Sequence, residues 1–113
     1  MAHTLYLVEP DPTERRRLQS VLAAAVDTVA AFENVETFRA QAGALDSGCL
    51  VASAALPRLL ALLKWLQRRG VALPVIVLDR DTAFRTAVEI MRAGATDFIE
   101  TGFDDRHLLA AVR

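Results

Sequence analysis

The sequence predicts an α/β fold with a doubly wound, five-stranded parallel sheet in the strand order 2-1-3-4-5. Five short β-rich or apolar runs alternate with five helical patterns, and strict alternation is typical of a parallel sheet covered by helices. The length of 113 residues and the hydrophobic content of 53% suit one compact domain with a core. Two of the runs, Cys49–Ala52 and Val75–Leu78, are apolar throughout, as central strands buried on both faces are.

The strands are expected in five runs of β-branched, aromatic and small apolar residues. Because consecutive parallel strands are joined by right-handed crossovers, the helices between the runs are expected to cover both faces of the sheet. The expected strands are Thr4–Val8, Thr28–Phe32, Cys49–Ala52, Pro74–Leu78 and Ala95–Ile99.

The first two helices have clear start signals. Asp11 provides an N-cap, Pro12 stands at the first helical position, and Glu14 occupies the third. Asn34 is the expected cap of the second helix, which would bury Val35, Phe38 and Ala42. The first helix would bury an apolar stripe at helical spacing, formed by Leu18, Val21, Leu22 and Ala25.

The third helix is expected to open at Pro57 and to close at Gly70, after the basic pair Arg68 and Arg69. Its apolar residues are Leu59, Leu60, Leu63 and Leu66.

The last two helices follow the same pattern of caps and glycine ends. Asp81 or Thr82 is the expected cap of the fourth helix, which ends at Gly94, and Asp104 is the expected cap of the fifth. The fourth helix would bury Ala87, Val88 and Met91, and the fifth Leu108, Leu109 and Val112.

The composition argues against several functions. A net charge of −1 removes the electrostatic basis for nucleic-acid or anionic-membrane binding by this segment. The single cysteine, Cys49, lies in an apolar run and is read as a small core residue in a reducing, cytoplasmic setting. The N-terminal apolar stretch is interrupted at Glu9, so no signal peptide is expected, and no run approaches the ~20 residues of a membrane span.

Doubly wound sheets place their functional crevice beyond the carboxyl ends of the strands, near the switch between the first and third strands. The candidate site residues therefore follow the predicted strands. They are Glu9, Pro10, Asp11, Ser53, Asp79 and Thr101.

Four segments around these strands resemble the receiver domains of bacterial two-component response regulators, which have the flavodoxin-like (βα)5 fold. They are Leu5–Pro12, Gly48–Val51, Leu73–Leu78 and Ala87–Glu100, the last followed by Phe103–Asp105. The likeness is greatest to receivers that precede a helix-turn-helix output domain, as in nitrogen-fixation regulators. Residues 1–113 are accordingly interpreted as one receiver-like domain, the excised N-terminal regulatory part of such a regulator.

The resemblance implies phosphoryl transfer from a histidine kinase to an aspartate, with magnesium bound by an acidic pair. In an alignment without gaps, that acidic pair becomes Glu9-Pro10 and the acceptor aspartate becomes Ser53. The family's switch hydroxyl becomes Asp79, and its lysine-proline becomes Thr101-Gly102. The loop that leads into the third helix is also shorter than in the family, because Pro57 is followed directly by Arg58 and Leu59 with no glycine turn.

These changes predict a receiver that does not accept a phosphoryl group on aspartate. Pro10 and Ser53 supply no carboxylate for magnesium, so magnesium binding is expected to be weak or absent, and no other cofactor is expected. Thr101 cannot supply the positive charge that a transferring phosphoryl group needs. Glu9 is expected to accept a hydrogen bond from Ser53 or Thr101, and Asp79 to cap the fourth helix or to pair with Arg80 or Arg85.

Function is then expected through protein contacts, with a protein partner, a second copy of the chain, or a histidine kinase. The resemblance gives the fourth helix, fifth strand and fifth helix as the dimer and output face, and a mixed-charge set there suits pairing across a two-fold axis. Phe98 stands at the family's aromatic switch position, where phenylalanine is equally a core residue. The expected face residues are Arg85, Glu89, Arg92, Asp97 and Arg106.

Two alternatives remain open from the sequence. One is a true phosphoacceptor that uses altered chemistry on Ser53 or Asp79. The other is a small-ligand-binding or enzymatic domain of flavodoxin-like fold, against which stand the acidic strand ends and the absence of a glycine-rich phosphate loop after the first strand.

Overall fold

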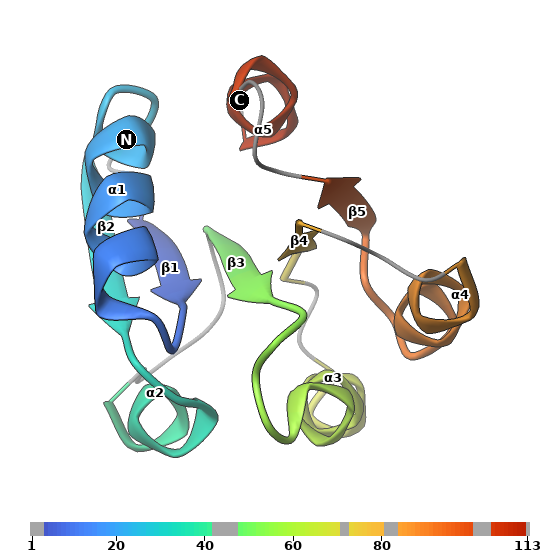
Figure 1. Ribbon diagram of the computed structural model, residues 1–113. Helices are drawn as coiled ribbons and strands as arrows, with labels where there is room; N and C mark the ends of the chain where they lie inside the picture. The colour runs from blue at the N-terminus through green and yellow to red at the C-terminus, as the bar shows by residue number, and fades with distance from the viewer. Residues whose placement is uncertain (1–3, 42–47, 71–72, 81–83, 101–104, 113) are drawn as a thin grey trace.

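The computed structural model describes residues 4–41, 48–70, 73–80, 84–100 and 105–112 (Figure 1). Its elements alternate strictly between strand and helix, and all strand pairs are parallel in the order β2-β1-β3-β4-β5, as predicted. The strands are β1 Thr4–Val8, β2 Thr28–Phe32, β3 Cys49–Ser53, β4 Val75–Asp79 and β5 Asp97–Glu100. The helices are α1 Pro12–Ala23, α2 Val35–Gln41, α3 Leu59–Arg68, α4 Phe84–Arg92 and α5 Arg106–Val112.

The helices form two layers, one on each face of the sheet (Figure 1). Helices α1 and α5 cover one face, where Leu18, Leu22 and Leu108 pack against Leu5 and other strand residues. Helices α2, α3 and α4 cover the other face over a second apolar cluster. Alternate residues of β1 serve the two clusters, because successive side chains of a strand point to opposite faces. That second cluster includes Phe38, Leu62, Leu63 and Ile90.

The predicted caps of the first two helices are present. The Asp11 Oδ1 atom accepts a hydrogen bond from the backbone N of Thr13 at 3.1 Å. The Asn34 Oδ1 atom accepts one from the backbone N of Thr37 at 2.8 Å. Both bonds satisfy donors that the first helical turn leaves without a partner. The predicted caps Asp81, Thr82 and Asp104 lie outside the described residues.

Helix α3 begins two residues later than the sequence predicts. Its N-cap is Arg58, whose φ of 68° is left-handed, and helical structure starts at Leu59 and not at Pro57. Leu60, expected on the apolar stripe, is 38% exposed, whereas Leu62 is fully buried. Four leucines in five positions surround too much of the helix for periodicity to say which of them face the core.

The prediction for α4 is wrong in the same way. Ile90 is the residue that α4 buries, whereas Met91 is 42% exposed and Ala87 and Val88 are only half-buried. The apolar arc of this helix is wide, and contact with the sheet selects one edge of it. The other edge is left facing solvent.

Strand ends differ from the predictions by one or two residues. β3 and β4 each continue one residue further, to Ser53 and Asp79, and β5 starts at Asp97 and not at Ala95. Ser53 and Asp79 are both candidate site residues, and each is therefore the last residue of its strand. Pairing within the sheet fixes the direction of their backbones.

Candidate functional site

The carboxyl ends of β1, β3 and β4 enclose a cavity of about 270 Å³. The structure brings the predicted residues Glu9, Pro10, Asp11, Ser53 and Asp79 together there, whereas Thr101 lies outside the described residues. Parallel pairing of β3 with β1 and β4 explains this, because it sets the ends of these strands at one edge of the sheet. The lining is completed by Glu14, Leu18, Ala55, Leu78 and Arg80.

Glu9 is the buried carboxylate of this cavity, with 7% of its surface exposed. It follows β1 directly, and its backbone N donates to the carbonyl of Phe32 at 3.0 Å. Its Oε1 atom accepts a hydrogen bond from the backbone N of Asp11 at 3.3 Å. Burial raises the pKa of Glu9 above its ordinary value, against the opposing effect of hydrogen bonds from Asp11 and Ser53.

Ser53 stands at the acceptor position and is 8% exposed. Its Oγ atom accepts a hydrogen bond from the backbone N of Ala55 at 3.1 Å, and its hydroxyl donates to the Glu9 carboxylate. The expected bond between Ser53 and Glu9 is thus present. The hydroxyl acts as donor and acceptor at once, as a buried polar group does when its hydrogen bonds are satisfied.

Two further carboxylates of the site bond to backbone donors. Asp11 caps α1, and the Asp79 Oδ1 atom accepts from the backbone N of Arg80 at 2.7 Å. The expected pairing of Asp79 with Arg80 includes this backbone bond, and the guanidinium group of Arg80 reaches Glu14. Among the described residues, no group of three or more His, Cys, Asp or Glu side chains is placed to hold a metal ion.

An ion network that the sequence does not predict borders the cavity. Glu14 contacts the guanidinium groups of Arg17 at 2.7 Å and Arg80 at 3.1 Å. Arg17 also contacts Asp105 at 2.9 Å. These arginines lower the pKa of Glu14, with the hydrogen bond from Arg17 as the largest cause. The spacing of Glu14 and Arg17 could have signalled their pair, but Asp105 is 88 positions from Arg17 and only the fold brings them together.

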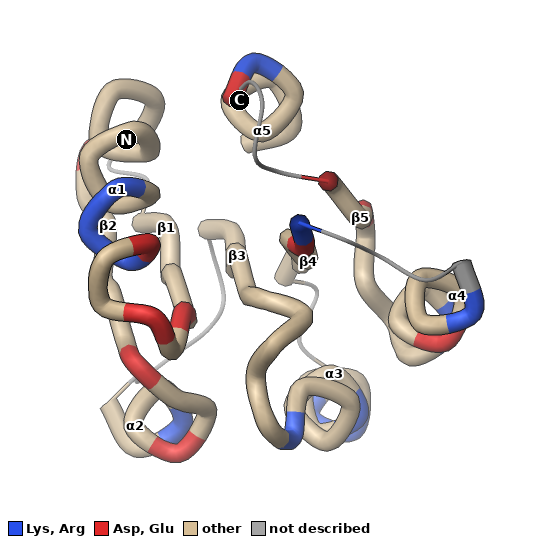
Figure 2. The backbone as a smooth tube through the Cα atoms, viewed as in Figure 1, with Lys and Arg blue, Asp and Glu red and all other residues tan. Residues whose placement is uncertain are grey.

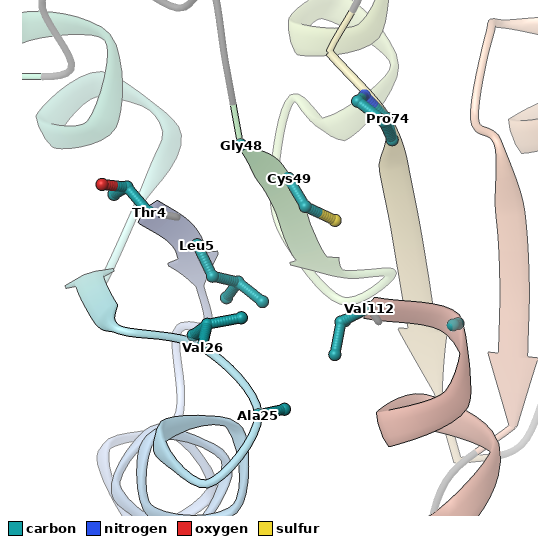
Figure 3. Close-up of a pocket in the computed structure, with 9 residues that line it drawn as sticks. Thr4, Leu5, Ala25, Val26, Gly48, Cys49, Pro74 and Val112 are labelled. Carbon is teal, nitrogen blue, oxygen red and sulfur yellow. The ribbon is translucent and has the colours of Figure 1, made fainter. Parts of the chain in front are cut away.

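A second cavity of about 320 Å³ lies at the opposite edge of the sheet (Figure 3). It is lined mostly by apolar side chains, including Leu5, Val26 and Val112, together with Cys49. Burial raises the pKa of the Cys49 thiol to about 11, so the thiol stays protonated at neutral pH. This supports the reading of Cys49 as a packing residue.

The predicted partner face is exposed and mixed in charge, with acidic and basic segments side by side on α4 (Figure 2). Ala87, Val88, Met91 and Arg92 line a shallow hollow on it. Phe98 is half-buried and packs against the core cluster under α2, α3 and α4. All five predicted charged residues are exposed: Arg85, Glu89, Arg92, Asp97 and Arg106.

A doubly wound sheet with a polar cavity at the ends of β1, β3 and β4 is the arrangement expected of the receiver domains that the sequence resembles. Residues 5–113 match the family profile of the response regulator receiver domain, so the chain belongs to this family. None of the helices in the described part of the chain is long and apolar enough to cross a membrane.

Particular relatives are transcriptional regulators. The chain is 34% identical over 111 residues to the transcriptional regulatory protein FixJ of Azorhizobium caulinodans, covering 96% of this chain and 53% of that protein. It therefore spans about half the length of this curated relative. The FixJ-N crystal structure superposes with a TM-score of 0.87 at 30% identity, over 99% of this chain and 91% of that one. A receiver protein of Pseudoalteromonas atlantica gives 0.84 at 32% identity, over 96% and 93%.

Proposed function

We propose that this receiver signals without accepting a phosphoryl group on aspartate, and that it acts through protein contacts. The observation that carries the proposal is the bonding of Ser53, which replaces the acceptor aspartate and is bonded to Glu9 and to the backbone N of Ala55. A buried hydroxyl held in this way supplies a fixed polar contact between β1 and β3. It has no carboxylate charge with which to attack a phosphoryl donor.

The surrounding charges support the same proposal. Asp79 places a negative charge where the family resemblance gives a hydroxyl, and it would repel an incoming phosphoryl group. The guanidinium group of Arg80 is engaged by Glu14 at 3.1 Å. Magnesium binding by this site is proposed to be weak or absent, because Pro10 offers no side-chain oxygen and the Glu9 carboxylate is occupied by hydrogen bonds.

The proposed output is homodimerisation, or binding of a protein partner, through α4, β5 and α5. The exposed apolar edge of α4 supports this, because Met91 lies among charged residues that suit reciprocal pairing. Since the matched regulators are about twice as long, we propose that the chain is the regulatory half of a cytoplasmic transcriptional regulator. A histidine kinase is a further candidate partner.

Phosphotransfer is tested by incubating the protein with acetyl phosphate and magnesium and measuring its intact mass. We expect no added phosphate, while a receiver that retains the acceptor aspartate, treated identically, gains one. A mass gain of one phosphate on this chain would overturn the proposal.

One observation favours a second candidate, phosphorylation of Ser53 itself. Its hydroxyl donates to a carboxylate whose pKa burial raises, which is how a base is placed beside a nucleophile. If mass is gained, the Ser53→Ala variant decides between sites. Loss of the gain would assign it to Ser53, and retention would point to Asp79 or another residue.

A further inference from the structure

The ring of Trp65 on α3 contacts two arginines, Arg39 on α2 and Arg69 directly after α3. The guanidinium carbon of Arg39, on α2, lies 4.6 Å from the centre of the Trp65 ring, and that of Arg69 lies 4.8 Å from it. Trp65 is half-buried and packs against the core cluster, whereas both arginines are exposed. The core therefore fixes the ring, and the ring orders both guanidinium groups by cation–π contact.

Two more cations extend this surface along α3. Lys64 and Arg68 are exposed, and with Gln67 they line a shallow hollow. Within the part of the chain that the structure describes, no acidic side chain forms an ion pair with Arg39, Lys64, Arg68 or Arg69. Figure 2 shows basic positions on α2 and α3, two helices that lie on the opposite face of the sheet from α1 and α5. We call Arg39, Lys64, Trp65, Arg68 and Arg69 the tryptophan–arginine surface.

We propose that the tryptophan–arginine surface docks an acidic segment of a protein partner, with two or more Asp or Glu side chains. A guanidinium fork matches a carboxylate in geometry as well as in charge. Tryptophan and arginine are the residues that most often dominate the binding energy of protein interfaces. Because Trp65 already orders both arginines, binding loses less side-chain entropy than it would with free arginines.

A peptide partner is favoured over a nucleic acid by charge. The chain carries a net charge of −1, whereas nucleic-acid-binding domains are usually strongly basic. A few carboxylates therefore match the local positive charge of this surface better than a long phosphate backbone does.

The tryptophan–arginine surface shares no residue with the Ser53 cavity or with the α4, β5 and α5 face. The inference consequently stands whether or not the proposed function holds.

The chain contains one tryptophan, so its fluorescence reports on this surface alone. The experiment titrates the protein with a hexaglutamate peptide, with a hexaglutamine peptide as the uncharged control. We expect a saturable change in Trp65 emission with hexaglutamate only, and an affinity that falls as salt is added. Arg39→Gln should weaken binding at least about fivefold. The matched Arg16→Gln variant removes an exposed arginine from α1 and should bind as the wild type does.

Three results would overturn the inference. The first is the absence of a saturable change with hexaglutamate while circular dichroism shows a folded protein. The second is equal weakening by Arg39→Gln and Arg16→Gln, which would indicate unspecific attraction to net charge. The third is tighter binding of a six-nucleotide oligothymidylate than of hexaglutamate, which would make the surface a nucleic-acid site.

Discussion

Glu9 is a buried carboxylate at the end of β1, and Ser53 lies beside it at the end of the adjacent strand β3. In the folded chain, burial disfavours the charged form of Glu9 and raises its pKa. Ionised Glu9 therefore opposes folding at neutral pH. Glu9 lines the polar cavity at the strand ends, where its carboxylate is kept at a cost in stability.

The Glu9→Gln variant tests this directly. Folding raises the pKa of Glu9 above its ordinary value of 4.5. Glu9 therefore lowers the free energy of unfolding by its full amount at pH values above the folded-state pKa, and does not lower it below pH 4.5. The variant should be more stable than the wild type at pH 7, and the difference should shrink as the pH falls toward 4.5. Urea unfolding at several pH values measures this, and Glu33→Gln on an exposed residue controls for the lost charge. A Glu9→Gln protein less stable than the wild type at pH 7 would contradict it.

At the scale of elements, the network of Glu14, Arg17, Arg80 and Asp105 joins parts far apart in the sequence. It connects α1 to the residue before α5 and to the end of β4. Exposed ion pairs contribute little, but Glu14 is only 13% exposed and bonds to two arginines. A network that is partly buried stabilises more than its separate pairs would.

Arg17→Gln should lower the free energy of unfolding by about 1 kcal/mol, because it breaks two of the three contacts of the network. Arg16→Gln, one position earlier on the same helix, should change it by less than about 0.5 kcal/mol. Urea unfolding of both variants gives the comparison.

The Arg17→Gln effect should shrink at high salt, and also as the pH falls below 4.5, since the lowered pKa of Glu14 contributes stability only while Glu14 is ionised. Equal effects of Arg16→Gln and Arg17→Gln would show that the network adds nothing.

At the scale of the whole molecule, the two helix layers leave different surfaces for partners. The large apolar side chains exposed in the described residues are Met91 and Leu60. Met91 belongs to the α4 edge that the core does not cover, within the face expected to dimerise. Leu60 lies on α3 and is a matched control, with 38% exposure against 42% for Met91.

Met91→Glu should therefore shift the protein toward monomer, whereas Leu60→Glu should leave assembly unchanged. Multi-angle light scattering over a range of protein concentrations measures the mass. Thermal unfolding should move little for either variant, because both side chains are exposed. A wild-type protein that stays monomeric at high concentration would count against homodimerisation, and equal effects of the two variants would place the interface elsewhere.

The sequence by itself determined the elements, the strand order and the residues at the strand ends. Local rules were sufficient for the elements: Asp11 and Asn34 cap their helices wherever those helices pack, and apolar runs such as Cys49–Ala52 become central strands. The strand order followed from the topology rules for alternating strands and helices. The position of Glu9 beside Ser53 followed from parallel pairing alone.

Only the tertiary structure decided which side of a broad apolar helix is buried. Ile90 and Leu62 face the core while Met91 and Leu60 do not, because contact with the sheet fixes the rotation of each helix. It also decided the contacts between distant residues, such as Arg17 with Asp105 and Arg39 with Trp65. Sequence periodicity describes one element at a time, whereas these contacts depend on how two elements are placed against each other.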